Sequence, residues 1–223
     1  MRAARAARAA LAALGTLLAA CGAPHGGGTP ASTPPPPTPL AHSDTTGLAL
    51  VPAGYGSLKQ EDISVSIRLP QILVRCSPLD EATIRLLSPD SYRALRGLRE
   101  SQRDAIAADA RRLGIERPSL WYMSFYGLQP DARYTARDVV ISSGGRDYRP
   151  VDVLSLSSGF SSERVGQGQV QSAIYVFAGG IDPAQPLAIT VESVRSAAWS
   201  TVIPVIERER ALVRSRVAPG PPS

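Results

Sequence analysis

Hydrophobic and polar side chains alternate at several places in the last three quarters of the chain, the pattern of a strand with one buried face. In segment 63–69, Ile, Val and Leu alternate with Ser and Arg, and Pro70 then ends the pairing or marks an edge strand. The glycine pair Gly144-Gly145, between two apolar runs, predicts a β-hairpin. The other predicted strands are 48–51, 121–126, 139–141, 148–156, 170–177, 187–194 and 199–203.

A different period, close to that of a helix, runs through residues 78–113. Ser77-Pro78-Leu79-Asp80 and Ser88-Pro89-Asp90 both resemble helix starts, and Gly114 is a favourable stop. Gly97 is a candidate break between two helices. A second, short helix is predicted from Pro204 to about Arg216, with its glutamates early and its arginines late.

Seven or eight short strands separated by turn signals favour an antiparallel β-sandwich. Over residues 47–203 the order of these patterns resembles the immunoglobulin-like domains of secreted bacterial lipoproteins, although the paired cysteines of antibody domains are missing. We therefore expect a mainly β fold: an immunoglobulin-like antiparallel β-sandwich with a helical insertion at 78–113 and a short C-terminal helix. This domain is predicted to span 47–216, followed by a disordered tail at 217–223.

The first 20 residues have the layout of a secretory signal peptide. Three arginines precede the apolar run Leu11–Ala20, which is too short to span a bilayer. The run ends in Leu18-Ala19-Ala20-Cys21, which resembles the lipobox of bacterial lipoproteins. The resemblance implies that Cys21 is acylated and becomes the new N-terminus. Because Gly22 follows it rather than Asp, the resemblance also implies outer-membrane sorting, facing the periplasm or the surface.

Residues 21–46 form a low-complexity stretch rich in Pro and Gly. Such a composition cannot bury enough surface to offset the entropy of ordering, so we expect a disordered tether between the anchor and the domain.

The charge of the chain gives no reason to expect nucleic acid as a partner. Loss of the three signal arginines would leave 21 of the 24 basic residues against 19 acidic ones, a net charge of +2. Several arginines do gather on the predicted helical insertion. We interpret them as a solvated face, with an anionic partner as the alternative; they are Arg96, Arg99, Arg103, Arg111 and Arg112.

The usual catalytic groups are scarce in the predicted domain. Both histidines, His25 and His42, lie in the tether, so a Ser-His or Cys-His mechanism has no base there. Zinc would need more Cys and His than Cys76 alone, and the acidic pairs at 61–62 and 80–81 lack calcium-loop spacing. Cys76 follows an apolar run and is interpreted as a buried hydrophobic residue. We expect no catalytic residue, metal or cofactor.

An aromatic cluster at 121–126 provides the candidate binding surface. Trp121, Tyr122, Phe125 and Tyr126 could pack on both sides of a strand, and core packing is the favoured interpretation. A stacking platform for sugar or peptide is the alternative, with Trp121, Tyr122, Tyr126 and Trp199 as its residues.

These observations favour a lipid-anchored envelope protein that acts as a non-catalytic binding or structural module. It would contact the membrane through lipidated Cys21 and an envelope protein or a glycan through its domain. The alternatives are a carboxylate-only enzyme such as a glycan hydrolase, and a periplasmic assembly factor that uses an exposed sheet edge.

Overall fold

A computed structural model describes residues 50–217 of the chain. The predictions for the signal peptide, Cys21, the tether and the tail after Val217 concern residues outside this range. Of the predicted strand 48–51, only Leu50 and Val51 are described, and neither belongs to a strand. Val51 is nevertheless buried in the core, so the apolar pattern there marks burial without strand pairing.

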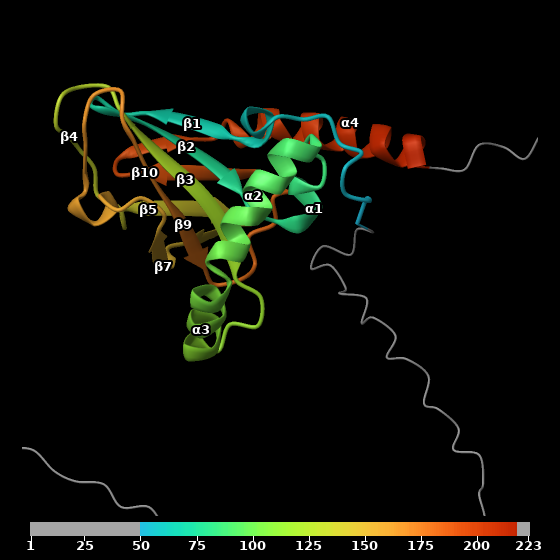
Figure 1. The fold of residues 1–223 in the computed structure, drawn as a ribbon, viewed down its shortest axis with the longest axis horizontal. Coiled ribbons are helices and arrows are strands. Elements are labelled where there is room, and N and C mark those ends of the chain that lie inside the picture. The colour runs from blue at the N-terminus through green and yellow to red at the C-terminus, as the bar shows by residue number, and fades with distance from the viewer. Residues whose placement is uncertain (1–49, 218–223) are drawn as a thin grey trace, which may run out of the picture. The chain divides into compact units, whose positions relative to one another are not determined.

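The described residues form two main antiparallel sheets, a two-stranded ribbon and four α-helices (Figure 1). The first sheet has the order β1-β2-β3-β9-β7 and the second β11-β10-β5-β6. The strands are β1 (Val65–Arg68), β2 (Ile72–Pro78), β3 (Ser119–Gly127), β4 (Ala132–Arg133), β5 (Val139–Ser143), β6 (Arg146–Tyr148), β7 (Pro150–Ser155), β8 (Arg164–Val165), β9 (Val170–Phe177), β10 (Leu187–Val191) and β11 (Val194–Ser196). The mainly β prediction is confirmed and the arrangement is consistent with a β-sandwich, whereas the immunoglobulin-like identity stays a prediction.

Strand β3 is the centre of the five-stranded sheet. It pairs with β2 and β9 along nearly its whole length. The alternation seen in the sequence places Trp121, Met123 and Phe125 on one side, all almost completely buried. Phe125 stacks on Tyr134 with ring centroids 4.4 Å apart, which extends the core toward the β4–β8 ribbon.

The predicted edge and hairpin are both present. β1 lies at the edge of its sheet, and pairing ends at Arg68, shortly before Pro70. Gly144 and Gly145 join β5 to β6 with positive φ angles of 56° and 75°, as a tight hairpin turn requires. The predicted single strand 148–156 is in fact divided, because β6 ends at Tyr148 in one sheet and β7 continues in the other.

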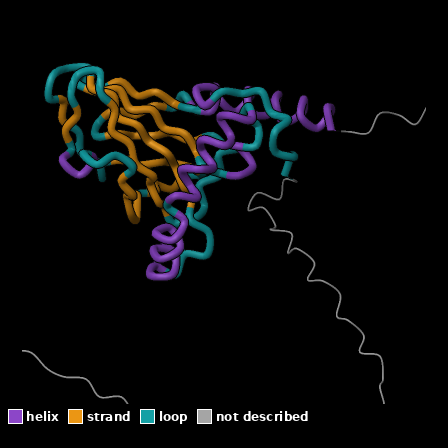
Figure 2. Tube along the Cα trace, viewed as in Figure 1, coloured by secondary structure: helices purple, strands orange, loops and turns teal. Residues whose placement is uncertain are grey.

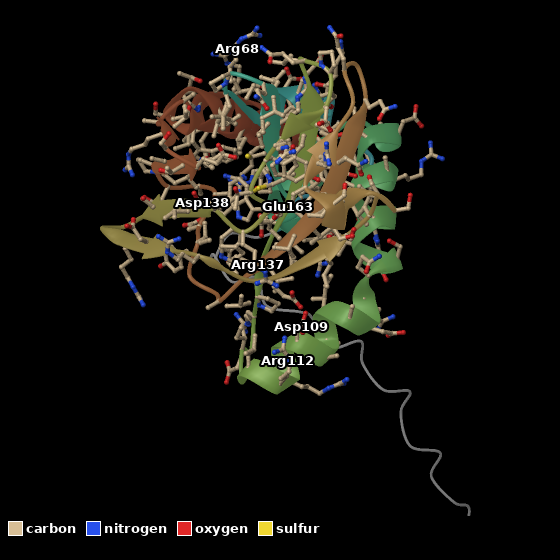
Figure 3. All side chains as sticks on the ribbon, turned by 90° about the vertical axis from the view of Figure 1, so that its left-hand side faces the viewer. Arg68, Asp109, Arg112, Arg137, Asp138 and Glu163 are labelled. Carbon is tan, nitrogen blue, oxygen red and sulfur yellow. The ribbon has the colours of Figure 1, made fainter. Side chains whose placement is uncertain are left out.

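The helical insertion between β2 and β3 is confirmed. It consists of α1 (Glu81–Ile84), α2 (Pro89–Ser101) and α3 (Arg103–Leu113). Figure 2 shows α2 alongside the strands and α3 extending past their ends, and Figure 3 gives the same picture from the side. Gly114 ends α3 with φ 64°, as predicted.

Two details of the insertion correct the sequence analysis. Ser77 and Pro78 are the last residues of β2, and Asp80 caps α1 by accepting the Thr83 N–H at 3.0 Å. The break between α2 and α3 falls at Gln102. Gly97 stays inside α2, since a helix interior tolerates a glycine at modest cost.

The C-terminal helix is longer than predicted. α4 runs from Trp199 to Val217, so residues 199–203, predicted as the last strand, form its first turns. Pro204 lies inside the helix instead of starting it. Burial of Trp199 explains the difference: its ring packs edge-on to Trp121 at 5.5 Å, and tertiary packing overrides the local strand preference.

Candidate binding site

A large open cavity lies between α3 and the nearby end of the five-stranded sheet, and we call it the α3 pocket. It has a volume of about 1120 Å³ and is open on one side. Four segments line it: the β2–α1 junction at 79–81, the facing sides of α2 and α3, the return loop and start of β3 at 114–121, and the loop at 180–183. Because these segments are far apart in sequence, the pocket exists only in the folded chain.

Hydrogen bonds hold the sandwich side of this pocket in place. The Leu79 N–H donates to the Leu120 carbonyl at 2.8 Å, which continues the pairing of β2 with β3. On the same side, Trp199 Nε1 donates to the Pro183 carbonyl at 2.9 Å, and the Tyr148 hydroxyl donates to the Gly180 carbonyl at 3.2 Å. The loop at 180–183 is thereby tied to both α4 and the β5–β6 hairpin.

A small ion network holds α3, the other wall. Arg112 donates to Asp109 at 2.6 Å and lies 3.8 Å from Asp152 on β7, which Arg137 also contacts at 3.2 Å. Figure 3 shows Asp109 and Arg112 together on α3, with Arg137 on the side toward the sheets. The hydrogen bond from Arg112 lowers the pKa of Asp109 below its ordinary value. Through the contact between Arg112 and Asp152, the network links α3 to β7.

The rim of the α3 pocket carries arginines. Arg99 lies 3.5 Å from Glu81. Arg103, Arg111 and Arg117 are exposed and make no ion pair or side-chain hydrogen bond with any residue in the range 50–217. The first three of these four arginines were predicted as part of a solvated face. Arg117 was not associated with them, because it lies in the loop after α3.

Two neighbouring carboxylates on the inner wall have their pKa values shifted in opposite directions. Burial raises the pKa of Asp80, outweighing the hydrogen bonds that Thr83 donates. Burial acts in the same direction on Glu81, but hydrogen bonds from Arg85 and Tyr92 outweigh it, so the pKa of Glu81 is lowered. Both groups have structural roles, Asp80 as the cap of α1 and Glu81 as the partner of Arg85 at 2.8 Å.

The structure does not gather the candidate aromatic residues on one surface. Trp121 is 1 % exposed and Trp199 is 0 % exposed, so both are core residues. This agrees with the favoured interpretation of core packing for Trp121, and the alternative surface role of the two tryptophans is wrong. Tyr122 and Tyr126 lie on the other side of β3, half-buried, with the Arg75 guanidinium 5.6 Å from the Tyr126 ring. Trp121 reaches only the floor of the α3 pocket.

The other features considered in the sequence were Cys76, a metal site and a membrane-spanning segment. Cys76 is fully buried, and burial raises the pKa of its thiol to about 12, as the interpretation of a buried hydrophobic residue requires. Between residues 50 and 217, His, Cys, Asp and Glu side chains form no group of three or more that could hold a metal ion. In the same range, no helix has the combination of length and apolar character needed to cross a bilayer. Cys21 lies outside the described residues.

The described residues thus form a mainly β protein with two main antiparallel sheets and an open pocket between α3 and one end of the five-stranded sheet. Comparison with protein-family models, with curated proteins and with solved structures found no match to the chain.

Proposed function

We propose that the protein is a lipid-anchored module of the cell envelope that binds a ligand in the α3 pocket without catalysing a reaction. The anchoring part depends on the sequence alone, through the apolar run that ends in Cys21. The binding part depends on one observation: the α3 pocket combines an apolar floor with arginines that have no partner within residues 50–217. Apolar pockets with a few convergent polar groups are the usual sites for ligands.

One observation favours a carboxylate-only enzyme as the second candidate. Asp80 has a raised pKa and lies close enough to Asp182 for the two charges to repel, and both line the α3 pocket. A carboxyl group with a raised pKa is what a general acid needs. Asp80, however, is engaged by both the Thr83 N–H and the Thr83 hydroxyl at 3.0 Å, which a capping role explains fully.

The sheet-edge alternative has less support. β1 has four residues and contacts β11 beside it, and β6 has three. β7 is longer, but Asp152 on it is held by Arg112 and Arg137 next to α3. Strand addition needs a long open edge, and none of these strands offers one.

Filling the α3 pocket tests the binding proposal. Ala107 lines the pocket, whereas Ala108, its neighbour on α3, is exposed and lies outside it. Envelope material captured by the full-length protein, analysed by mass spectrometry for proteins and small molecules, should lose a specific component in Ala107→Trp and keep it in Ala108→Trp. Identical capture by both variants would rule out the pocket as the binding site. Turnover of envelope glycans that depends on Asp80 would favour the enzyme instead.

Anchoring has a separate test. Incorporation of a fatty-acid probe into the chain should be abolished by Cys21→Ser and unchanged by Cys76→Ser, because Cys76 is buried in the core. Labelling of the Cys21→Ser chain at the wild-type level would refute a lipid anchor at this residue.

A further inference from the structure

The floor of the α3 pocket is apolar and continuous with the core. Leu79, Leu120, Trp121 and Ile181 are all buried residues, and each lines the pocket. On the helix side, Ile106 and small alanines complete the lining. Small side chains on α3 leave depth between the helix and the sheet end, so an aliphatic group could displace water from this surface. Removal of such a group from water is favourable.

Formal charge on the lining is balanced, but the charges are not equally engaged. Four arginines face four carboxylates. Asp80 caps α1, Glu81 is paired with Arg85 and Arg99, and Asp182 accepts the Ala184 N–H at 2.9 Å. Glu116 is the one carboxylate of the lining with no partner in residues 50–217, against the three unengaged arginines Arg103, Arg111 and Arg117. The three guanidinium groups, which have no ion-pair partner in that range, are therefore the groups of the rim that are free to bind an anion.

An extended peptide is a poor fit to this floor. A bound strand gains affinity from main-chain hydrogen bonds with an open sheet edge. Here β3 pairs with β2 on one side and β9 on the other, and the Leu79 N–H is already used by Leu120. The pocket thus presents side chains and little free backbone, and its volume of about 1120 Å³ is close to that of small-molecule sites.

We propose that the α3 pocket takes an amphiphilic anion: an aliphatic chain that lies on the floor and an anionic head group at the rim, where Arg103, Arg111 and Arg117 have no ion-pair partner within residues 50–217. The inference depends on the proposed binding function and names the class of its ligand. A carboxylate and a phosphate head both match the guanidinium groups.

The two tryptophans of the chain provide the assay, because Trp121 is at the floor and Trp199 packs against it. The probe is 12-bromododecanoate, whose bromine quenches nearby indole fluorescence. It is added to the full-length chain carrying Cys21→Ser, so that no acyl group of the protein competes. We expect saturable quenching that dodecanoate reverses and that 12-bromododecanol, with no charge, reproduces at least tenfold more weakly. Competition by dodecyl phosphate distinguishes the two head groups.

The head-group contacts are tested by replacing the three free arginines with Gln. This variant should bind 12-bromododecanoate roughly tenfold more weakly, as the loss of several partly exposed ion pairs implies. The matched control replaces Arg149, Arg208 and Arg214, which are exposed and lie outside the pocket, and should bind like wild type. Equal binding by both triple variants, equal quenching by the alcohol, or no saturation would overturn the inference.

The two proposals fail in different ways. If the brominated probe does not bind but Ala107→Trp still loses its envelope component, the pocket is a binding site for another class of ligand. If capture is also identical in Ala107→Trp and Ala108→Trp, the binding function itself is refuted.

Discussion

Glu209 connects α4 to the segment that precedes the first sheet, and its removal is the sharpest test of how this helix is held. The carboxylate is 4 % exposed. Its Oε1 accepts the Ser57 N–H at 2.8 Å, the Ser57 hydroxyl at 2.9 Å and Arg216 Nη1 at 3.1 Å. One buried oxygen therefore fixes three donors from two distant parts of the chain.

The expected loss follows from these contacts. A hydrogen bond to a charged group contributes about 1.5–3 kcal/mol, and a buried donor left without a partner costs about 1–3 kcal/mol. The Arg216 pair adds less, because Arg216 is 42 % exposed and solvent screens it. Removal of the Glu209 side chain also removes the cost of burying its carboxylate, which offsets part of this loss. We therefore expect Glu209→Ala to lower the free energy of unfolding by about 2–3 kcal/mol. Glu209→Gln keeps an acceptor and should lose roughly half as much.

Urea unfolding of the full-length chain, followed by tryptophan fluorescence, measures this difference. Trp199 is buried on the same helix as Glu209 and reports its release from the core. Glu100→Ala is the matched control: Glu100 lies on α2, is exposed and makes no side-chain hydrogen bond or ion pair within residues 50–217. It should change stability by less than about 0.5 kcal/mol. If Glu209→Ala is no more destabilising than the control, the reasoning is refuted.

Three further outcomes can be checked on the same chain. The Cys76 thiol, with its pKa raised to about 12 by burial, should resist iodoacetamide in the folded protein and react in 8 M urea; native labelling would place it at the surface. Arg112 lowers the pKa of Asp109 below its ordinary 3.8, so their contribution to stability is present above about pH 3.8 and is lost as pH falls through the lower folded-state value. The difference in unfolding free energy between wild type and Asp109→Asn should therefore be larger at pH 6 than at pH 3, and a constant difference would contradict the assignment. A Cβ on Gly179 would overlap a carbonyl oxygen on the facing loop, whereas one on Gly97 meets open space in α2. Gly179→Ala should therefore lower the free energy of unfolding by about 1–3 kcal/mol, and Gly97→Ala should raise it by up to about 1 kcal/mol. The opposite order would show that the two loops yield easily.

The local sequence pattern correctly predicted the elements whose structure depends mainly on their own residues. The alternation at 121–126 and 170–177 marked β3 and β9, which pair with each other in the centre of a sheet. Gly114 and the glycine pair at 144–145 were correctly identified because positive φ is a property of the single residue. The same kind of reasoning failed at 199–203, where apolar and β-favouring residues form helix turns. There the deciding contact, Trp199 on Trp121, joins residues 78 positions apart in the chain and leaves no mark on the local pattern.

The α3 pocket could not be predicted for a related reason. Its floor residues have the apolar pattern of an ordinary core, and its arginines have that of an ordinary exposed helix. Neither pattern shows that the end of β3 and the loop at 180–183 lie opposite α3. Arg117 in particular carries no helical or strand signal, and only the fold places it on the same rim as Arg103 and Arg111.

The position of the insertion explains why such a pocket arises here. β2 and β3 are paired up to the Leu79–Leu120 hydrogen bond, so the chain must leave and return at the same end of the sheet. α2 lies alongside the strands and buries Tyr92 and Leu95. α3 extends past the strand ends, and Ile106 is the one large apolar side chain that it buries, whereas Leu113 is 41 % exposed. α3 is therefore held by the burial of Ile106 and Asp109 and by the contact of Arg112 with Asp152 on β7. A helix held in this way leaves its inner apolar face open across the pocket, and that is the face that a ligand would cover.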